Sequence, residues 1–335
     1  MARGRPSTSG SRLAGLLGLG CLLLVLLAAS IAVGARTLSL SDLWHVLLHA
    51  DDGRTSVIVW QLRLPRTLMG AVVGAALGTA GALTQALCRN ALAEPGLLGI
   101  NAGAALAVVL GMALSVAPGL AGQAGLALFG AMIAALGVHA LDRIAPGDRR
   151  GVHLVLTGAA VSASIRACTG IITMSDSGVF DNYRFWVVGS LSRPLPVGIN
   201  AVLVILLLLA GLSSLWGGRL NALALGEEPM RALGLRPGAT RLGLFGAIVL
   251  LCGLSTALVG PIAFLGLVVP HSARLLIGGD WRWILPYSAV LGALLLIAAD
   301  ILGRLIVSPG ELEAGIVIAF LGAPLLLWLV NRRPI

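Results

Sequence analysis

Long uninterrupted apolar runs restrict the possible folds of this chain more than any other feature. Ten of them have the length of a membrane-spanning helix: 13–35, 64–87, 96–116, 120–141, 152–174, 197–216, 241–259, 261–277, 284–304 and 313–331. A helix needs about 20 apolar residues to cross a bilayer, whereas strands of a membrane barrel are shorter and alternate in polarity. The chain is 58% apolar and 11% charged, too few polar residues to cover a soluble fold. We therefore predict an all-α polytopic membrane protein with about ten transmembrane helices.

The chain divides into a short polar tail and one large domain. Residues 1–12 are polar and basic and form the predicted tail, and residues 13–335 form a single transmembrane domain. A basic start followed by an apolar run ending in AVGA also resembles a signal peptide, but the run is long enough to span and many spans follow it. We therefore prefer an uncleaved first helix. Ser39 to His49 is predicted to be a short amphipathic helix at the membrane interface.

The arginines predict the orientation in the membrane. All 23 basic residues are arginine, and most lie in short loops between apolar runs. Fifteen fall in one set of loops and seven in the opposite set, with Arg166 inside a span. Because cytoplasmic loops carry the excess of positive charge, both termini are predicted to be cytoplasmic. This distribution, with 4% aromatic residues, also argues against nucleic-acid binding.

Two loops are longer than a connection needs. Residues 175–196 fall on the outer side and carry Tyr183, Phe185 and Trp186, a composition that allows a re-entrant piece covered by protein. Residues 217–240 fall on the cytoplasmic side. There, Asn221 to Leu233 is predicted to form one short helix across the membrane face, ended by Gly234.

Glycines recur every four residues early in the second span. Gly70, Gly74 and Gly78 share one helix face, and Gly81 follows them. Such spacing lets a second helix approach almost to backbone contact, and it is found in many membrane helices. We predict a close helix–helix contact along this face.

No catalytic or metal-binding motif is present. The chain has no lysine, which a Walker A loop requires, and its four cysteines and five histidines are scattered without ligand spacing. We predict that the chain is not an enzyme and carries no metal or cofactor. Any energy from nucleotide hydrolysis must then come from a partner subunit.

Charges within the spans are few. Arg166 lies in the middle of the fifth span, where an arginine costs roughly 2.5–3.5 kcal/mol, so it either lines a pathway or pairs with a neighbour. Asp300 and Arg304 lie four residues apart and are spaced for an ion pair within one helix. Polar side chains also surround the breaks beside the third span, either as helix caps or as a gate: Gln85, Asn90, Glu94 and Asn101.

Several consecutive segments together resemble one family. They are RLPRTLMGAVVGAALGTAGALTQALCRNALAEPGLLGINAGA, LALGEEPMRALGL and VGPIAFLGLVVPHSARLLIGGDWRWILPYSAVLGALLLIAADILGRLI. They are similar to the FecCD-type permeases of ABC importers for iron–siderophores, haem and cobalamin. Three segments are most similar to ferric-enterobactin-type (catecholate siderophore) permeases: NYRFWVVGSL, RNALAEPGLLGINAGA and SPGELEAGIVIAFLGAP.

The resemblance implies a type II ABC-importer permease bundle in the cytoplasmic (inner) membrane, surrounded by membrane lipid. It implies a second permease, identical or different, two cytoplasmic ATPase subunits and a substrate-binding protein. Arg63, Arg66 and Arg304 match positions that face acidic residues of the binding protein. Asn90, Leu92 and Arg166 belong to segments that match the gate and pathway walls. The ATPase-coupling residues are Leu223, Ala224, Leu225, Gly226, Glu227, Glu228, Met230, Arg231, Leu233 and Gly234.

This sequence departs from the family pattern at two places. Glu311-Leu312-Glu313 stands where ELP is common, which bears on where the last span begins. Met230 stands where a small residue is usual, which bears on the choice of ATPase.

The function expected from these residues is the import of an iron–siderophore complex, driven by the partner ATPases. The alternative is an ion-coupled secondary transporter, for which Asp300 is the chief candidate carboxylate, and a third possibility is a membrane scaffold without a ligand. The residues leave open whether the ligand is a siderophore, haem or cobalamin.

Overall fold

The computed structural model describes residues 9–34, 54–116, 119–144, 150–193, 199–307 and 310–332, and every regular element within these ranges is helical. The predicted amphipathic helix at 39–49 lies outside the described residues. The elements are α1 (Ser9–Ala32), α3 (Arg54–Val57), the π-helix η1 (Ile58–Arg63), α4 (Leu64–Cys88), the 3₁₀ helix η2 (Pro95–Leu98), α5 (Ile100–Ala113), α6 (Leu120–Ile144), α7 (Arg150–Ser175), α8 (Ser177–Val187), α9 (Ile199–Ser214), α10 (Gly217–Leu225), α11 (Glu227–Ala232), α12 (Pro237–Val259), α13 (Leu265–Ile277), α14 (Trp281–Ile306) and α15 (Ala314–Arg332).

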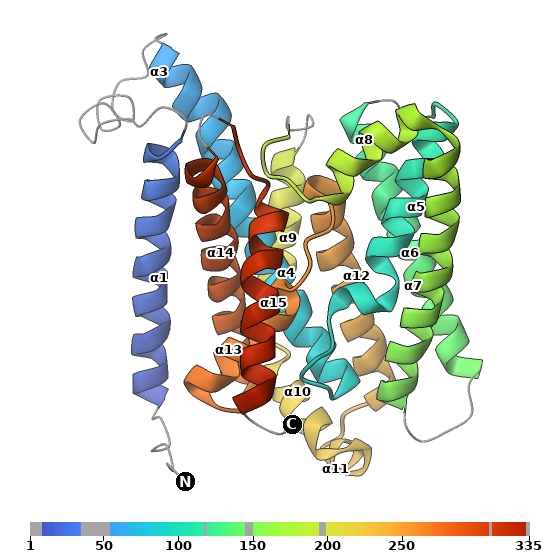
Figure 1. Ribbon diagram of the computed structural model, residues 1–335. Coiled ribbons are helices and arrows are strands. Elements are labelled where there is room, and N and C mark those ends of the chain that lie inside the picture. The colour runs from blue at the N-terminus through green and yellow to red at the C-terminus, as the bar shows by residue number, and fades with distance from the viewer. Residues whose placement is uncertain are drawn as a thin grey trace.

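The long helices run side by side as one bundle, as Figure 1 shows. Each predicted span corresponds to one of them: α1, α4, α5, α6, α7, α9, α12, α13, α14 and α15. Six described helices are long and apolar enough to cross a membrane, and bent α9–α10 makes a seventh if counted as one span. The three shorter apolar helices are Ile100–Ala113, Leu265–Ile277 and Ala314–Leu327. The prediction of an all-α bundle of about ten spans is confirmed.

The two ends of the bundle differ. Helix α8 lies across one end, here called the α8 end, and α10 and α11 project from the other, the α11 end (Figure 1). Helix α1 begins at the α11 end and α15 finishes there, so the chain enters and leaves the bundle on one side. Helix α1 begins at Ser9, four residues before the predicted start.

Helix α4 is the centre of the bundle and packs closely against α14. A Cβ added at Gly74 would lie 2.5 Å from the carbonyl oxygen of Gly292 on α14, and one at Gly78 would meet the Ser288 carbonyl. At Gly81 it would meet the backbone of Gly266 on α13. The predicted glycine contact is therefore confirmed, with α14 and α13 as its two partners.

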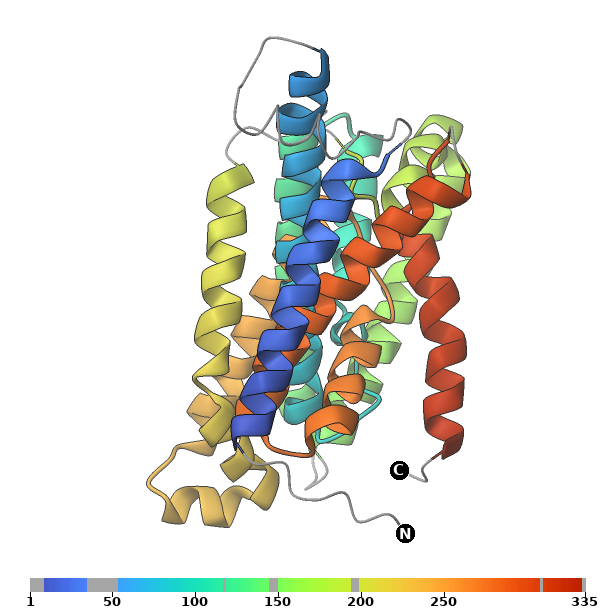
Figure 2. The same ribbon diagram turned by 90° about the vertical axis from the view of Figure 1, so that its left-hand side faces the viewer.

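Helix α1 lies at the edge of the bundle. Figure 2 shows it on the face of α14, with α9 and α15 to either side. Only 6% of the most apolar stretch of α1 is buried within the chain, against 78% for the continuous helix Thr55–Cys88. Most of the α1 surface is therefore left for lipid.

Two spans are shorter than predicted because backbone that is not α-helical occupies their first turns. Helix α5 starts at Ile100 after η2, and α13 starts at Leu265 after an extended stretch from Gly260. Irregular backbone is tolerated at membrane depth where protein covers it. The Gly260-Pro261 boundary was read correctly as a break, but α13 begins a turn later than expected.

The helix containing α4 is longer than its predicted span. Elements α3 and η1 extend it toward the α8 end, so one continuous helix runs over Thr55–Cys88. Pro65 has no N–H, and its ring would clash with the Gln61 carbonyl in a regular α-helix. The wider π-helix just before Pro65 accommodates that ring.

The segment predicted as one helix from Asn221 to Leu233 is two helices, α10 and α11. Gly226 separates them with φ 123° and ψ 175°. A continuous helix would set the Pro229 ring against the Leu225 carbonyl, whereas Pro229 in the first turn of a new helix needs no partner for its missing N–H. The position of Pro229 therefore explains the break.

Within the predicted outer loop, the described residues 176–193 form a surface helix, α8, followed by irregular backbone that is buried at 189–191, rather than a re-entrant span. Asp176 caps α8 by accepting hydrogen bonds from the N–H groups of Gly178 and Val179. Trp186 is buried beneath α8, and after it the Ser190 N–H donates to the Val259 carbonyl at 2.7 Å. Protein thus covers the non-helical backbone.

Candidate functional sites at the two ends of the bundle

A charged cluster occupies the α8 end, between α4, α14 and α1. Asp300 accepts hydrogen bonds from Arg66 at 2.7 Å, and its other oxygen is ion-paired with Arg304. Arg66 also pairs with Glu311 at 2.6 Å. The predicted pair of Asp300 and Arg304 is confirmed, and Arg66 joins it from 234 residues away.

The same cluster holds the end of α1. Arg304 donates to the Ser30 carbonyl at 2.8 Å and to the Val33 carbonyl at 3.0 Å. Arg63 donates to the Ile31 and Ala32 carbonyls at 2.8 and 2.9 Å. The last carbonyls of a helix have no partner within it, and the positive charges suit the negative end of its dipole. Arg63 and Arg304 therefore serve as a cap that fixes α1.

The three arginines predicted to face a binding protein lie together but differ in exposure. Arg63 and Arg304 are buried, at 8% and 4% exposure, whereas 15% of the Arg66 side chain is accessible. Glu311, which precedes the departing residue Glu313 by two positions, is the acidic partner on the open side of Arg66. Only Arg66 among the three offers side-chain surface to a molecule at this end.

The residues predicted to couple to an ATPase lie in and just after two helices, α10 and α11, which have a buried side and an exposed side. Leu223 and Met230 are buried against the bundle, with 1% and 0% exposure. The residues on the outer side are Ala224, Leu225, Glu228, Arg231, Leu233 and Gly234. Since Met230 points inward, its side chain is an anchor for α11 and is not available for contact with an ATPase.

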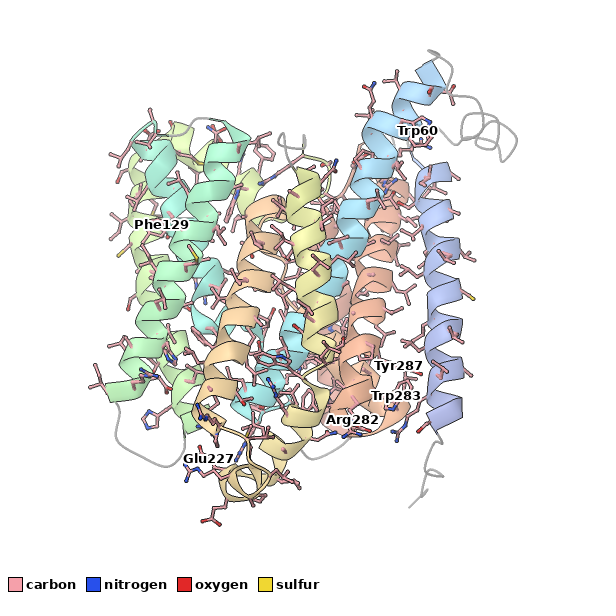
Figure 3. All side chains as sticks on the ribbon, turned by 180° about the vertical axis from the view of Figure 1, so that it is seen from behind. Trp60, Phe129, Glu227, Arg282, Trp283 and Tyr287 are labelled. Atoms are coloured by element: carbon pink, nitrogen blue, oxygen red, sulfur yellow. The ribbon has the colours of Figure 1, made fainter. Side chains whose placement is uncertain are left out.

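Glu227 ties α11 to the bundle. One carboxylate oxygen pairs with Arg231 at 3.1 Å in the same helix, and the other with Arg241 of α12 at 3.0 Å. Figure 3 shows Glu227 at the far end of the molecule from Trp60.

A second tie joins α10 to α14 and α1. Asn221 donates to Asp280 at 2.8 Å and accepts from the Trp281 N–H at 3.0 Å, while Arg12 of α1 pairs with Asp280 at 3.4 Å. Partial burial alone would raise the pKa of Asp280, but the hydrogen bonds from Asn221 and from the Arg282 N–H outweigh it and hold that pKa below its usual value. Asp280 is thus a charged N-cap for α14.

The predicted gate residues lie in the turn after α4. Asn90 is exposed, and its side-chain oxygen accepts from the Leu92 N–H at 2.9 Å. Leu92 is partly buried. Arg166 is remote from this turn, on the outward face of α7, and among the described residues it reaches only the Ser162 carbonyl at 3.4 Å.

Two residues connect the turn after α4 to α10 and to the start of α13, and the sequence hardly distinguishes them from other polar residues. The sequence indicates Glu94 only as a polar residue at a break, and Arg89 is only one of the fifteen arginines in the loops of one side. The Arg89 guanidinium donates to the Leu223 carbonyl at 2.7 Å, and the Glu94 carboxylate accepts from the Phe264 N–H at 2.9 Å. Both partners are backbone atoms distant in sequence, which a motif cannot indicate.

No cluster of three or more metal-ligating side chains exists within the part of the chain that the structure describes. Comparison with known proteins decides the class. The FecCD transport family matches residues 22–332. The chain belongs to the FecCD transport family.

Several permeases of known transport systems match most of this chain. The ferric enterobactin transport system permease protein FepD of Escherichia coli (strain K12) is 43% identical, with 94% of each chain covered. The hemin transport system permease protein HmuU of Yersinia pestis is 37% identical over 95% of this chain and 96% of its own. The vitamin B12 import system permease protein BtuC of Vibrio cholerae serotype O1 is 36% identical, covering 92% and 93%.

The fold agrees with a solved FecCD-like architecture. A structure described as an inward-facing metal-chelate type ABC transporter superposes with a TM-score of 0.84 at 26% identity, covering 95% of this chain and 99% of that one. This FecCD protein is therefore a membrane permease of an ABC importer system. Such systems include ATPase and substrate-binding partners and a second permease, and its relatives are permease subunits rather than enzymes.

Proposed function

We propose that this chain is the permease subunit of an ATP-driven importer that moves an iron–siderophore complex of the catecholate type across the cytoplasmic membrane. The observation that carries the proposal is the 43% identity to the ferric enterobactin permease FepD over 94% of both chains. The ligand would be delivered by a substrate-binding protein outside, and ATP would be hydrolysed by two partner subunits inside.

We infer that the α11 end is cytoplasmic and receives the ATPases. The exposed side chains of α10 and α11 support this, because Leu225 and Leu233 leave apolar surface uncovered beside Arg231, with exposures of 72% and 65% for the leucines. The excess of arginine in the loops of this end supports the same orientation, with both termini in the cytoplasm.

The binding protein would dock at the α8 end. Arg66 would present its charge to an acidic partner, and Arg63 and Arg304 would contribute positive potential from behind it. Charge complementarity of this kind favours correct encounter more than raw affinity. The partial exposure of Arg66 supports the assignment.

Helix α7 would face a second permease and the pathway. Small residues and a charge are exposed along its middle, namely Ala159, Ala160, Ala163, Arg166 and Ala167, beside the exposed large apolar side chains of Leu156, Ile171 and Met174. Small residues suit helix–helix contact in a membrane, and an arginine there needs protein or water beside it. Asn90 and Leu92 would form the gate at the cytoplasmic end.

The ion-coupled alternative loses its chief candidate. A carboxylate that carries a coupled ion must be able to bind and release it, but Asp300 is buried between Arg66 and Arg304 at one end of α14. Both of its oxygens are engaged by guanidinium groups, which argues against a role in ion coupling.

Uptake of radioactive ferric enterobactin by a deletion strain expressing the chain with its partner subunits tests the proposal. Uptake should appear with the chain, disappear when the partner ATPase is catalytically dead, and persist when an ionophore collapses the ion gradients. Uptake that survives the dead ATPase but not the ionophore would favour the secondary transporter. Uptake of haem or cobalamin in place of the siderophore would correct the ligand alone.

A further inference from the structure

Two hydrogen bonds leave the turn that connects α4 to η2, in different directions. At its start, Arg89 donates to the carbonyl of Leu223, in the last turn of α10. At its end, Glu94 accepts from the N–H of Phe264, the residue that precedes α13. One short turn is therefore bonded both to the coupling segment and to the break between α12 and α13.

The turn between these two bonds is internally stiff. Arg89 ends α4 in the left-handed conformation, with φ 49° and ψ 35°, and the Asn90 N–H donates to the Gln85 carbonyl at 3.2 Å. Asn90 then accepts from the Leu92 N–H through its side chain and from the Ala93 N–H through its carbonyl. A residue other than glycine adopts the left-handed conformation only when its surroundings enforce it. A displacement of Arg89 is thus transmitted to Glu94 rather than absorbed between them.

The far bond acts on a strained position. Phe264 has φ 64° without being glycine, and it sets the point where extended backbone becomes α13. A carboxylate at a helix N-terminus also interacts favourably with the helix dipole. The Phe264 side chain lies against Gly322 of α15, where an added Cβ would be 2.6 Å from the Phe264 Cβ. Movement of Phe264 would therefore reach both α13 and α15.

We propose that Arg89 and Glu94 are positioning residues that carry movement of α10 and α11 to the start of α13, with the turn 89–94 as the lever. The inference rests on the proposed ATP-driven import, in which α10 and α11 receive the motion of the ATPases. It assigns a role to two bonds that neither the exposed coupling surface nor the outer arginines explain.

The test uses the full complex in proteoliposomes, with its ATPases, second permease and binding protein, and ferric enterobactin as the probe. Arg89→Met and Glu94→Leu each remove one bond, and each should lower the ligand imported per ATP hydrolysed about tenfold while ATP hydrolysis and subunit assembly persist. Glu94→Gln keeps an acceptor oxygen and should stay near wild type, and Arg89→Lys should recover part of the loss. Arg143→Met is the matched control, because Arg143 is an exposed arginine in the last turn of α6 and, among the described residues, makes no hydrogen bond to the turn.

The double variant Arg89→Met/Glu94→Leu separates a lever from two independent defects. If both residues act on one path, the double variant should import no less ligand per ATP hydrolysed than the worse single variant does. If the two defects are unrelated, the fold losses of the two single variants should multiply. If a single variant fails to assemble, amide exchange in the wild-type complex takes its place: ATP binding should change protection at 224–226 and at Phe264 together. The lever would be overturned if ATP binding changed amide protection at 224–226 alone. It would also be overturned if both single variants coupled transport to ATP hydrolysis normally, or if the fold losses of the single variants multiplied in the double variant. Absence of ATP-driven uptake by the wild-type complex would instead overturn the proposed function.

Discussion

Helices α4 and α7 are both apolar spans, but the rest of the chain buries most of α4 and leaves most of α7 exposed. Of the most apolar stretch of each, 78% is buried within the chain for the helix containing α4 and 17% for α7. Both carry arginine. Arg66 on α4 has Asp300 and Glu311 as partners, whereas Arg166 on α7 reaches only a backbone carbonyl among the described residues.

The difference shows which parts of the permease are complete in one chain. The glycine contacts of α4 are made with α14 and α13, and its arginine is paired with Asp300 and Glu311, so α4 is the scaffold on which the other helices are placed. Helix α7 leaves Arg166 exposed among small residues, and a lipid tail cannot satisfy that charge. Changes on α4 should therefore damage the single chain, and changes on α7 should damage the assembled transporter.

The largest effect on the scaffold side is expected from Asp300→Ala. It removes the shared carboxylate and leaves the guanidinium groups of Arg66 and Arg304 buried beside each other, a loss of about 3–5 kcal/mol for a broken buried pair. Thermal unfolding of the purified chain in detergent should report a large drop. The control is Asp181→Ala, which breaks an exposed pair with Arg184 and should change little. Equal stability of the two variants would mean that the cluster does not hold α1 and α4 to α14.

The next largest effect is expected when leucine and arginine are exchanged between the outward faces of α9 and α7. Leu208 is 58% exposed on the outward face of α9, and Leu208→Arg should impair insertion or stability by roughly 2.5–3.5 kcal/mol, because that face meets lipid. Arg166→Leu should leave the purified chain as stable as wild type but lower uptake by the assembled transporter several-fold. Stability of the chain and uptake by the complex are the two measurements. If the Leu208→Arg variant inserts and is as stable as wild type, the outward faces of α7 and α9 do not differ in their tolerance of an arginine.

Gly78→Leu should destabilise the isolated chain by an amount on the order of 1–3 kcal/mol. Its side chain would meet the Ser288 backbone on α14, which cannot retreat as a flexible side chain would. Gly137→Leu on α6 is a matched control, since an added Cβ there meets nothing within 4 Å. A folded Gly78 variant with unchanged thermal stability would contradict the close α4–α14 contact.

The sequence was sufficient wherever a signal is periodic or local. Hydropathy over about 20 residues found the ten helices, glycine spacing found the face of α4, and a spacing of four found Asp300 with Arg304. It was insufficient where the partner is remote: the bond from Arg304 to Ser30 joins residues 274 apart, and only the folded bundle brings them together. The break at Gly226 lies between these cases, because Pro229 signalled it and a single helix was predicted nonetheless.

The smallest effect is expected from Ala163→Leu, which tests whether a second permease, water or lipid lies against α7. Ala163 is exposed on the chain, so the added bulk should leave the isolated permease unchanged. If a second permease packs on this face, the larger side chain separates the two helices, and pairing measured by subunit exchange should weaken by roughly 1–3 kcal/mol. If the face lines a watery pathway, pairing stays constant and uptake falls instead. The control is Leu207→Phe on the exposed side of α9, which should change neither pairing nor uptake. If Ala163→Leu also changes neither, α7 faces lipid, and α4 and α7 differ only in how much of each is buried.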